Sequence, residues 1–487
     1  MVIGDLLIAH GLVTRADVED ALDRQRTQGG RLGEILVAMG KLRADALEAV
    51  LQSAPAKPSS IAETGLQTSD LLSLTIKAMH ANVLETPSTI GEVLKLSNNV
   101  VQAILDHAKE RKLVEVLGSA GVRVTSELRF TLTERGKQWA LEAIAQNQYI
   151  GPAPVPLPAY TERIHRQRIA NERVDPQSID RAFAGLSVSQ AFFQQIGPAI
   201  NSGKSILLYG PPGNGKTTYA ERIGEVFGDI VFIPYCFEVE GQIIKVFDPG
   251  VHHPIEQSLS KVPAVRREDF DARWVPCRRP FIVAGGELTL EMLDLSFNEI
   301  AKFYEAPLHV KALNGIFMID DFGRQIVTPE KLLNRWIVPL ERRIDYLKLH
   351  TGKSFSLPFD ELVIFSTNLS PQDLMDPAFL RRIPYKLPIL PPTPAQYRQI
   401  FIGMAKKSGL EVSEEMVAYV ISALRDRAQM PLASYQPKFI IEQVLSACKF
   451  AGISPQIHPE LVNLALANLA IREEPEMGPT SATVRAA

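Results

Sequence analysis

Five short apolar runs with strand character follow one another in the second half of the chain, separated by segments with helical spacing. The runs are SILLYG, VFIPYC, GIFMIDD, LVIFSTN and YKLPIL. Alternation of such runs with helical segments predicts an α/β domain built on a parallel sheet. We therefore expect an α/β core with a five-stranded parallel sheet over residues 186–390, followed by a helical lid over residues 391–473.

A different pattern precedes this core. APAKPSS, residues 54–60, has the composition of a linker. Three helical patterns follow (SDLLSLTIKAMH, TPSTIGEVLKL and SNNVVQAILDHAKERKL), and then two strand-like runs, LVEVLG and LRFTLTERG. Three helices before a hairpin are typical of a winged helix, which we expect over residues 61–148. Thr86 or Ser88, and Ser97, are the expected helix N-caps.

The first 53 residues contain an internal repeat. IGDLLIAHGLVTRADVEDAL at Ile3 aligns with LGEILVAMGKLRADALEAVL at Leu32, and the offset from Gly4 to Gly33 is 29 residues. Each unit has the pattern of a short helix, a glycine stop and a second helix. Residues 1–53 are therefore predicted to form a small duplicated helical domain.

Two segments are predicted to lack regular packing. YIGPAPVPLPAY has alternating prolines, which favour an extended conformation and exclude a helix, so residues 149–185 are expected to form a semi-rigid, proline-rich linker. The composition of residues 474–487 predicts a disordered tail.

Bulk composition narrows the class of protein. A chain of 487 residues with 46% hydrophobic residues accommodates about three domains. A formal net charge of -3 does not indicate a polyanionic partner. Cys236, Cys277 and Cys448 show no C-x-x-C spacing, so no disulfide framework or zinc site is expected. No basic leader or apolar run of ~18 residues is present, so we expect a cytoplasmic protein without membrane insertion.

A phosphate-binding motif lies between the run SILLY and a helical segment. GPPGNGKTT satisfies G-x-x-x-x-G-K-[ST], whose glycines let backbone N–H groups surround phosphates at a helix N-terminus. ATP and Mg²⁺ are the expected cofactors, with Lys216 reaching the β and γ phosphates and Thr217 holding the metal. The predicted nucleotide-binding residues are Gly210, Pro211, Pro212, Gly213, Asn214, Gly215, Lys216, Thr217 and Thr218.

Two acids and an amide end neighbouring apolar runs. Asp320, in IDDF, is predicted to hold Mg²⁺ beside Thr217, and Asp321 is the candidate catalytic acid. Asn368, which ends VIFSTN, can orient the attacking water by a hydrogen bond. Structural salt bridging by Asp320 and a simple strand-end cap at Asn368 are the alternatives.

With these motifs, residues 186–473 resemble the AAA+ ATPases. LLYGPPGNGKT is similar to their Walker A motif, FMIDD to Walker B, STN to sensor 1, and DPAFLRRIPYKLPI to their second region of homology. RRIP is similar to the arginine-finger segment of protease-associated unfoldases. The resemblance implies that Arg382, with Arg381 as the alternative, completes the site of a neighbouring subunit in a ring or partial ring.

The chain departs from the family pattern at two positions. Asp321 stands where a glutamate is usual, and a misplacement of about 1 Å can cost ~100-fold in rate, so slow hydrolysis is expected. Lys438, in QPKFIIEQVL, stands where the sensor 2 arginine is usual and supplies charge without a bidentate fork.

A long segment, Pro234 to Asn314, separates the two nucleotide motifs. Within it, KVPAVRREDFDARWVPCRRPF mixes basic residues with Phe270 and Trp274. Such a mixture could grip a peptide or a nucleic-acid strand, although a subunit-interface insert is favoured. His252 and His253 are predicted to lie in a surface loop rather than in a metal site.

The front domains indicate protein contacts. RLGEILVAMG resembles the N-terminal domain of type II secretion and type IV pilus assembly ATPases, which implies cyclic di-GMP binding. Val2 replaces an expected arginine, however, and Ala54 stands where the first unit has Gln25, so protein docking is favoured. Residues 61–150 contain nine basic and ten acidic residues, a balance that makes nucleic acid an unlikely partner.

These observations lead to one functional hypothesis and two alternatives. The chain is predicted to be an AAA+ ATPase that hydrolyses ATP and remodels or switches an unidentified protein partner, with a link to pilus or secretion machinery suggested by its first domain. The alternatives are a nucleotide-gated switch without hydrolysis and a DNA-binding regulatory ATPase that uses the winged helix.

Overall fold

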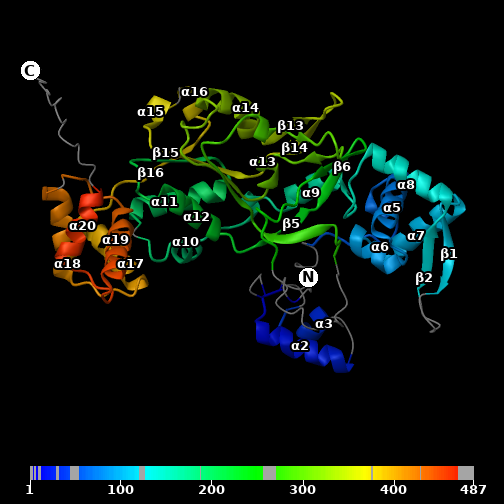
Figure 1. The fold of residues 1–487 in the computed structure, drawn as a ribbon, viewed down its shortest axis with the longest axis horizontal. Helices are drawn as coiled ribbons and strands as arrows, with labels where there is room; N and C mark the ends of the chain where they lie inside the picture. The colour runs from blue at the N-terminus through cyan, green and yellow to red at the C-terminus, as the bar shows by residue number, and fades with distance from the viewer. Residues whose placement is uncertain are drawn as a thin grey trace, which may run out of the picture.

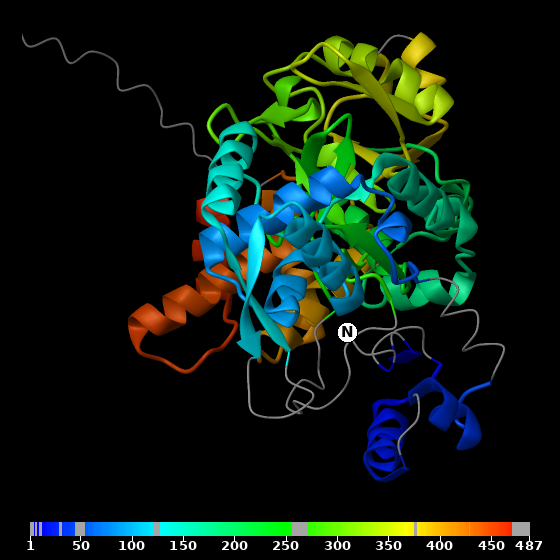
Figure 2. The same ribbon diagram turned by 90° about the vertical axis from the view of Figure 1, so that its right-hand side faces the viewer.

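The computed structural model describes residues 4, 7–8, 12–28, 32–43, 54–119, 127–186, 188–255, 270–374, 377–427 and 429–469. A central α/β core has a helical bundle at one end of its long axis and a module of helices and a hairpin at the other (Figure 1). The small N-terminal module lies beside the core, as both perpendicular views show (Figures 1 and 2).

A five-stranded parallel sheet forms the centre of the core and confirms the predicted α/β class. Its strands lie in the order β16-β4-β15-β12-β9, and every neighbouring pair is parallel. Their bounds are β4 (Ile206–Tyr209), β9 (Phe281–Ala284), β12 (Ile316–Ile319), β15 (Leu362–Thr367) and β16 (Tyr385–Pro388).

One predicted member of this sheet was wrong. The run VFIPYC forms β5 (Ile230–Pro234), which pairs antiparallel with β8 (Trp274–Arg278) in a separate ribbon. Its place in the parallel sheet is taken by β9. A buried apolar run has the same composition whichever way its partner runs, so the sequence could not distinguish the two pairings.

Side chains alternate between the two faces of the parallel sheet. Ile206 and Leu208 of β4 point to one apolar cluster, and Leu207 points to the other. The first cluster is covered by α10 (Pro176–Ala182), α11 (Gln190–Ser202) and α12 (Lys216–Glu225), and the second by α14 (Pro329–Arg342), which contributes the buried Trp336. The strands of the parallel sheet are therefore shielded from solvent between two helical layers.

The segment between the nucleotide motifs builds most of a second sheet, in the order β10-β11-β7-β6-β3. Its strands are β3 (Val155–Pro156), β6 (Cys236–Val239), β7 (Gln242–Lys245), β10 (Ser296–Phe297) and β11 (Tyr304–Glu305). The 3-10 helix η3 (Glu291–Leu293) and α13 (Leu308–Lys311) complete the segment, and a hairpin of β13 (Ile344–Lys348) and β14 (Ser354–Pro358) follows α14.

The expected proline-rich linker contains helices. Residues 149–185 hold β3, then α9 (Leu157–Arg166), η2 (Ile169–Asn171) and α10. The exclusion of a helix was wrong because Pro158 falls in the first turn of α9, where a backbone N–H has no intrahelical partner to lose. Immediately ahead of α9, β3 (Val155–Pro156) is extended.

The module after the first linker has the predicted three helices and hairpin. Its elements are η1 (Ala62–Thr64), α5 (Thr68–Asn82), α6 (Pro87–Leu94), α7 (Asn98–Glu110), β1 (Val114–Ser119), β2 (Leu128–Leu132) and α8 (Glu134–Gln146). Thr86 caps α6 in a capping box. Sequence reasoning missed α8, which begins inside the run read as a strand, although Thr133 is its N-cap and accepts a hydrogen bond from Gly136. The winged-helix assignment remains a prediction.

A buried arginine joins this module to the core. Arg273 pairs with both carboxylate oxygens of Asp271, and its Nη1 donates to the carbonyls of Thr64 and Pro154 at 3.0 Å each. The side chains of both charged residues are almost completely buried. One guanidinium therefore holds together the chain before α5, the chain before β3 and the segment that leads into β8.

A gripping surface, the alternative to the favoured subunit-interface insert, does not fit the buried residues of this segment, although Arg278 is exposed. Phe270 and Trp274 are buried. Arg279 is also buried, pairs with Asp229 and donates to the carbonyls of Gln167 and Asn314. Lys261, Arg266 and Arg267 lie outside the described residues.

The described residues nearest each end of the chain form helical modules. The C-terminal bundle consists of α17 (Pro394–Lys407), α18 (Glu414–Ser422), the π-helix η4 (Ala423–Arg427), α19 (Gln436–Ala451) and α20 (Pro459–Leu469), around its own core. Short helices α15 (Pro371–Leu374) and α16 (Pro377–Leu380) precede β16.

In the N-terminal module, α2 (Arg15–Gln28) and α3 (Leu32–Ala38) pack together. The repeat positions Leu7, Val18, Leu22 and Leu36 are buried there. Gly11, Arg31, Leu47 and Leu51 lie outside the described residues, as does the predicted tail, residues 474–487.

Glu361, immediately before β15, is a buried carboxyl at the start of the central sheet. It has no exposed surface, and neither side-chain oxygen has a hydrogen-bond partner among the described residues. Burial raises its pKa well above the ordinary value of 4.5, against the opposing effect of Arg343. The folded state therefore retains a proton that the unfolded chain releases above about pH 4.5.

Replacement of Glu361 by methionine should stabilise the protein at alkaline pH. A raised pKa in the folded state contributes stability below the unfolded pKa and loses it as pH rises toward the folded pKa. Removing an unpaired buried carboxyl should raise the free energy of unfolding by about 1–3 kcal/mol at pH 8 and by less at pH 5. Urea unfolding at both pH values measures this, with the exposed Glu330→Met as the control. An equal gain at both pH values would contradict the prediction.

Candidate nucleotide site

Three neighbouring parallel strands deliver the predicted site residues to one edge of the sheet. β15 lies between β4 and β12, and all three run in the same direction. The phosphate-binding loop follows β4, the acids Asp320 and Asp321 follow β12, and Asn368 follows β15. The carboxyl ends of parallel strands share an edge, so residues far apart in sequence meet there.

Two glycines in the loop occupy positions that other residues would not. A Cβ on Gly210 would lie 2.2 Å from the carbonyl oxygen of Ile389, and Gly210 has φ 144°. Gly215 has φ 86° and is the N-cap of α12. The loop thus turns tightly into the N-terminus of a ten-residue helix, a geometry that favours phosphate.

Lys216 is held at the centre of the site. Its Nζ donates to the carbonyls of Gly210 and Pro211 at 3.0 and 3.1 Å and to Oδ1 of Asn368 at 2.5 Å. Burial lowers the pKa of Lys216, while the charges of Asp321 and Asp320 oppose that shift. The ammonium therefore lies among oxygen atoms where a phosphate group could compete for it.

Thr217 and Asp320 form the predicted metal pair. Thr217 Oγ1 donates to Asp320 Oδ2 at 2.8 Å, and Asp320 Oδ1 accepts from the N–H of Asp321 at 3.0 Å. A hydroxyl and a carboxylate are oxygen donors of the kind that Mg²⁺ takes beside substrate phosphates. The donor set therefore fits the expected cation.

Asp321 and Asn368 also meet. Asn368 Nδ2 donates to Asp321 Oδ1 at 2.8 Å, and the same amide accepts from Lys216 through its oxygen. Asp321 has φ 48°, in the left-handed region where aspartate is tolerated better than most residues. Lys216, Asn368 and Asp321 thus form a continuous chain of hydrogen bonds beside the metal pair.

The C-terminal bundle contacts the loop directly. The N–H of Tyr435 donates to the carbonyl of Gly213 at 2.9 Å, and the N–H of Ser434 donates to Oδ1 of the buried Asn214 at 3.2 Å. Lys438 lies three residues beyond Tyr435 on α19, on the same helical face, and is exposed near Glu442. Sequence reasoning missed Tyr435, because no local pattern shows which loop an aromatic residue will touch.

Arg382 lies at the other end of the sheet. The Oγ of Ser205, just before β4, donates to the carbonyl of Arg382 at 3.2 Å. The four residues of β4 span about 13 Å, so this position is far from the phosphate-binding loop of the same chain. The Arg382 guanidinium pairs with Glu341 at 2.6 Å and stacks over Phe379, whereas Arg381 is exposed.

The two adjacent histidines differ in burial. His252 is buried, accepts from the N–H of Asp248 through Nδ1 at 2.9 Å and lies 2.8 Å from the carbonyl of Lys311 through Nε2. The surface-loop assignment was therefore wrong for His252, although His253 is exposed. In the part of the chain that the structure describes, no three His, Cys, Asp or Glu residues are grouped so that they could hold a metal ion.

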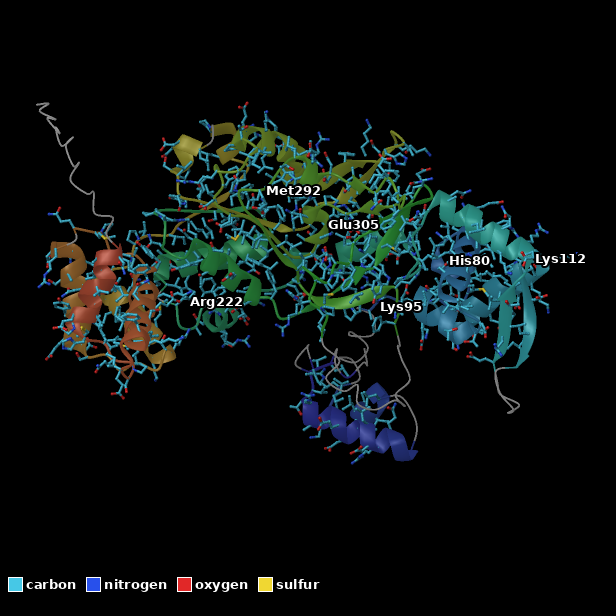
Figure 3. The ribbon with its side chains drawn as sticks, viewed as in Figure 1. His80, Lys95, Lys112, Arg222, Met292 and Glu305 are labelled. Atoms are coloured by element: carbon cyan, nitrogen blue, oxygen red, sulfur yellow. The ribbon has the colours of Figure 1, made fainter. Side chains whose placement is uncertain are left out.

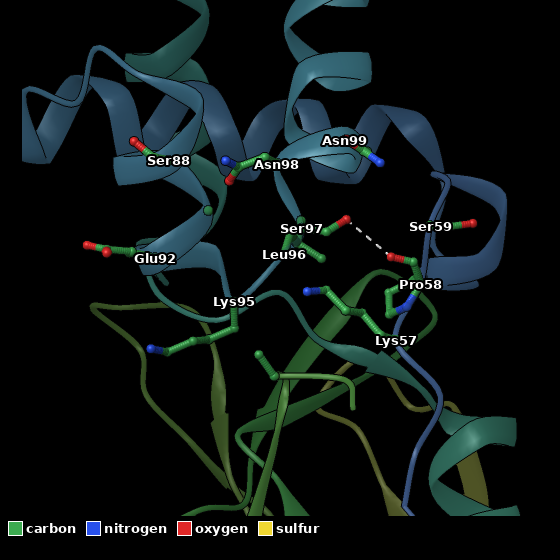
Figure 4. Close-up of a pocket in the computed structure, with 12 residues that line it drawn as sticks. Lys57, Pro58, Ser59, Ser88, Glu92, Lys95, Leu96, Ser97, Asn98 and Asn99 are labelled. Carbon is green, nitrogen blue, oxygen red and sulfur yellow. Dashed lines mark hydrogen bonds between the residues drawn. The ribbon is translucent and has the colours of Figure 1, made fainter. Parts of the chain in front are cut away.

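The start of α7, the helix considered for DNA reading, faces the core. A cavity of about 620 Å³ separates Asn98 and Asn99 from Lys57 and from Ala272 of the core (Figure 4). Ser97 Oγ donates to the carbonyl of Pro58 across this junction at 3.2 Å. Lys95 lies at the same junction, whereas His80 and Lys112 lie elsewhere on the module (Figure 3). The start of α7 therefore borders the junction with the core, although Asn98 and Asn99 themselves are exposed.

Comparisons with known proteins give one family match and several structural likenesses. Residues 393–468 match a family described as a domain of unknown function (DUF8689), which corresponds to the C-terminal bundle. The chain is similar to a RuvB variant from Thermotoga maritima, at 13% identity and a TM-score of 0.33, over 63% of this chain and 74% of that one. It is also similar to NtrX from Brucella abortus, at 14% identity and a TM-score of 0.36, over 61% of this chain and 58% of that one.

A further likeness is to T. maritima RuvB described as a Holliday junction branch migration motor, at 15% identity and a TM-score of 0.31, over 62% of this chain and 74% of that one. Scores at this level add nothing to the assignment of the site, which rests on the strand order and the contacts described above. Within the described residues, no helix combines the length and the apolar character needed to cross a membrane.

Proposed function

We propose that the core and the C-terminal bundle form an AAA+ ATPase that binds ATP with Mg²⁺ and hydrolyses it. The observation that carries this proposal is the meeting of Lys216, Thr217, Asp320, Asp321 and Asn368 at one sheet edge, in contacts of 2.5–2.8 Å. Each residue type is one that phosphoryl transfer uses, and the loop that leads into α12 suits phosphate.

The roles follow from the contacts. Lys216 neutralises phosphate charge, and Thr217 and Asp320 hold Mg²⁺, which supplies further charge neutralisation when bound. Asp321 accepts a proton from the attacking water, and Asn368 orients that water while it fixes the Asp321 carboxylate. Tyr435 joins the C-terminal bundle to the same loop, so that the bundle responds to the nucleotide, and Lys438, three residues further along the chain, supplies positive charge to the nucleotide.

The proposed enzyme is a homo-oligomer. Arg382 lies at the sheet edge opposite its own phosphate-binding loop, so it can serve as a finger only in the site of a neighbouring subunit. A ring or partial ring places one subunit's Arg382 beside the next subunit's loop. Isolated subunits then lack part of the charge that stabilises the transition state.

The test is phosphate release from ATP across a protein concentration series. Specific activity should rise with concentration as subunits assemble, and Lys216→Ala should be inactive at every concentration. ATP binding without turnover at any concentration would instead support the second candidate, a nucleotide-gated switch, which the short acid at Asp321 favours. Absence of both binding and turnover would overturn the proposal.

The front modules are proposed to contact a protein partner that the ATPase remodels or switches. Support comes from the balanced charge of residues 61–150 and from the position of α7 against the core, which leaves a DNA-binding regulator as the weaker alternative. The link to pilus or secretion machinery and the binding of cyclic di-GMP rest on the first domain alone. Calorimetry with cyclic di-GMP tests the latter, and no heat at high micromolar ligand would exclude it.

A further inference from the structure

The loop after β12 carries both acids on an unusual backbone. Asp321 has φ 48° and Gly323 has φ 103°, so two residues of a four-residue turn are in the left-handed region. A non-glycine residue in such a conformation costs about 1–3 kcal/mol and persists only where its surroundings hold it. The contacts that hold this loop therefore decide where the two carboxylates lie.

One side of the loop is fixed by β15. The N–H of Phe322 donates to the carbonyl of Ser366 at 2.6 Å, and Thr367 Oγ1 donates to the carbonyl of Phe322 at 2.8 Å. These bonds anchor the middle of the turn to the strand that ends in Asn368. The N–H of Asp320 donates to the carbonyl of Ala284 and the N–H of Arg324 donates to the carbonyl of Asp321, both at 2.9 Å, which leaves the Asp320 carbonyl and the Gly323 N–H to be held by another group.

The side chain of Gln325 holds both of these groups. Its Nε2 donates to the carbonyl of Asp320 at 2.7 Å, and its Oε1 accepts from the N–H of Gly323 at 2.9 Å. The amide nitrogen thus acts as donor and the amide oxygen as acceptor, and the two bonds span the turn that contains Asp320 and Asp321. Gln325 is partly buried and has no contact with the phosphate-binding loop in any described hydrogen bond.

We propose that Gln325 is a positioning residue that clamps this loop and so sets the places of both Asp320 and Asp321. The inference rests on the proposed ATPase function. An aspartate has one side-chain torsion fewer than a glutamate, so the place of its carboxylate follows the backbone more closely. A backbone clamp is therefore the means by which a short acid is kept within reach of the Asn368 amide.

The donor and acceptor requirements make the clamp specific to an amide. A glutamate at this position would still accept from the N–H of Gly323, but it would place a carboxylate against the carbonyl of Asp320 and beside two acids. Alanine would release both ends without adding charge. The two variants thus separate the loss of the clamp from an electrostatic disturbance of the metal pair.

The experiment compares Gln325→Ala and Gln325→Glu with wild type and with Ile326→Ala, whose side chain is exposed on the same loop. ATP turnover, melting temperature, and ATP affinity with and without Mg²⁺ are measured. For Gln325→Ala we expect kcat to fall about 10- to 100-fold and the gain in affinity on adding Mg²⁺ to shrink, with metal-free affinity and melting temperature unchanged. Gln325→Glu should lose more, and Ile326→Ala should match wild type.

Two outcomes separate failure of the clamp from failure of the proposed function. If wild type shows Mg²⁺-dependent ATP binding and Gln325→Ala retains both that dependence and any turnover, the clamp is overturned while the ATPase proposal stands. If wild type binds no ATP, the proposed function fails and the clamp fails with it. Because the Mg²⁺ dependence is measured from ATP binding, the experiment also tests the role of Gln325 if the wild-type protein binds ATP without hydrolysing it.

Discussion

Replacing Arg382 by alanine should lower ATP turnover of the assembled protein by about 10³- to 10⁵-fold, the usual contribution of an arginine finger. Nucleotide affinity should remain unchanged, because Arg382 lies at the sheet edge opposite its own phosphate-binding loop. Two controls separate the finger from its surroundings. Arg381→Ala removes the exposed neighbouring charge, and Glu341→Ala breaks the ion pair to Arg382 while it leaves the guanidinium in place. Both controls should retain most of the activity.

Mixing two inactive variants tests whether the finger acts between subunits. Lys216→Ala cannot use its own site but retains Arg382, and Arg382→Ala retains an intact loop. Mixed assemblies should contain intact loops beside intact fingers, so activity should reappear on mixing. No recovery in assemblies shown to contain both variants would contradict an action in trans.

Replacing Asp321 by alanine should lower turnover by about 10²- to 10⁴-fold, the range for loss of a general base. ATP and Mg²⁺ binding should persist, because the proposed metal ligands, Thr217 and Asp320, contact each other directly without Asp321. Asp321→Asn is the matched variant, since its side-chain oxygen can still accept from Asn368 but cannot take a proton. Comparable loss in both variants, measured by phosphate release at saturating ATP, would support a base. Full activity in Asp321→Asn would show that Asp321 has a structural role and is not the general base.

The same backbone geometry suits an aspartate at position 321, where the sequence resemblance leads us to expect a glutamate. Asp321 has φ 48°, and aspartate and asparagine occupy that region more readily than glutamate does. Asp321→Glu is therefore not expected to accelerate hydrolysis, because the longer side chain would strain the turn. The substitution tests whether the backbone or the side-chain length limits the rate.

The meeting of the candidate nucleotide-site residues was predictable, because their motifs are local and the parallel sheet brings the motifs together. GPPGNGKTT, IDDF and STN each end an apolar run, and parallel strands bring such ends together without further information. The residues that tune the site were not predictable. Gln325 bonds through its side chain to Asp320 and Gly323 within its own loop, and Tyr435 makes a tertiary hydrogen bond to Gly213, and no periodicity records either kind of contact.

Failures elsewhere have a shared physical cause. Arg273 and Trp274 have the composition of an exposed gripping surface, yet both are buried, because pairing and carbonyl acceptors can satisfy an arginine inside a protein as water does outside. In the same way, the alternating prolines were expected to exclude a helix, but Pro158 lies in the first turn of one. Composition describes which groups are present, whereas burial depends on partners that the sequence does not identify.

The buried guanidinium of Arg273 has a mechanical consequence. Arg273 joins the chain before α5, the chain before β3 and the segment that leads into β8. These bonds prevent the module of α5 to α8 from rotating relative to the α/β core. A partner bound to that module would therefore move together with the whole subunit. A conformational change driven by nucleotide would then move the bound partner only as far as one whole subunit moves relative to the next. To be unfolded or separated by that motion, the partner would have to be bound by two different subunits.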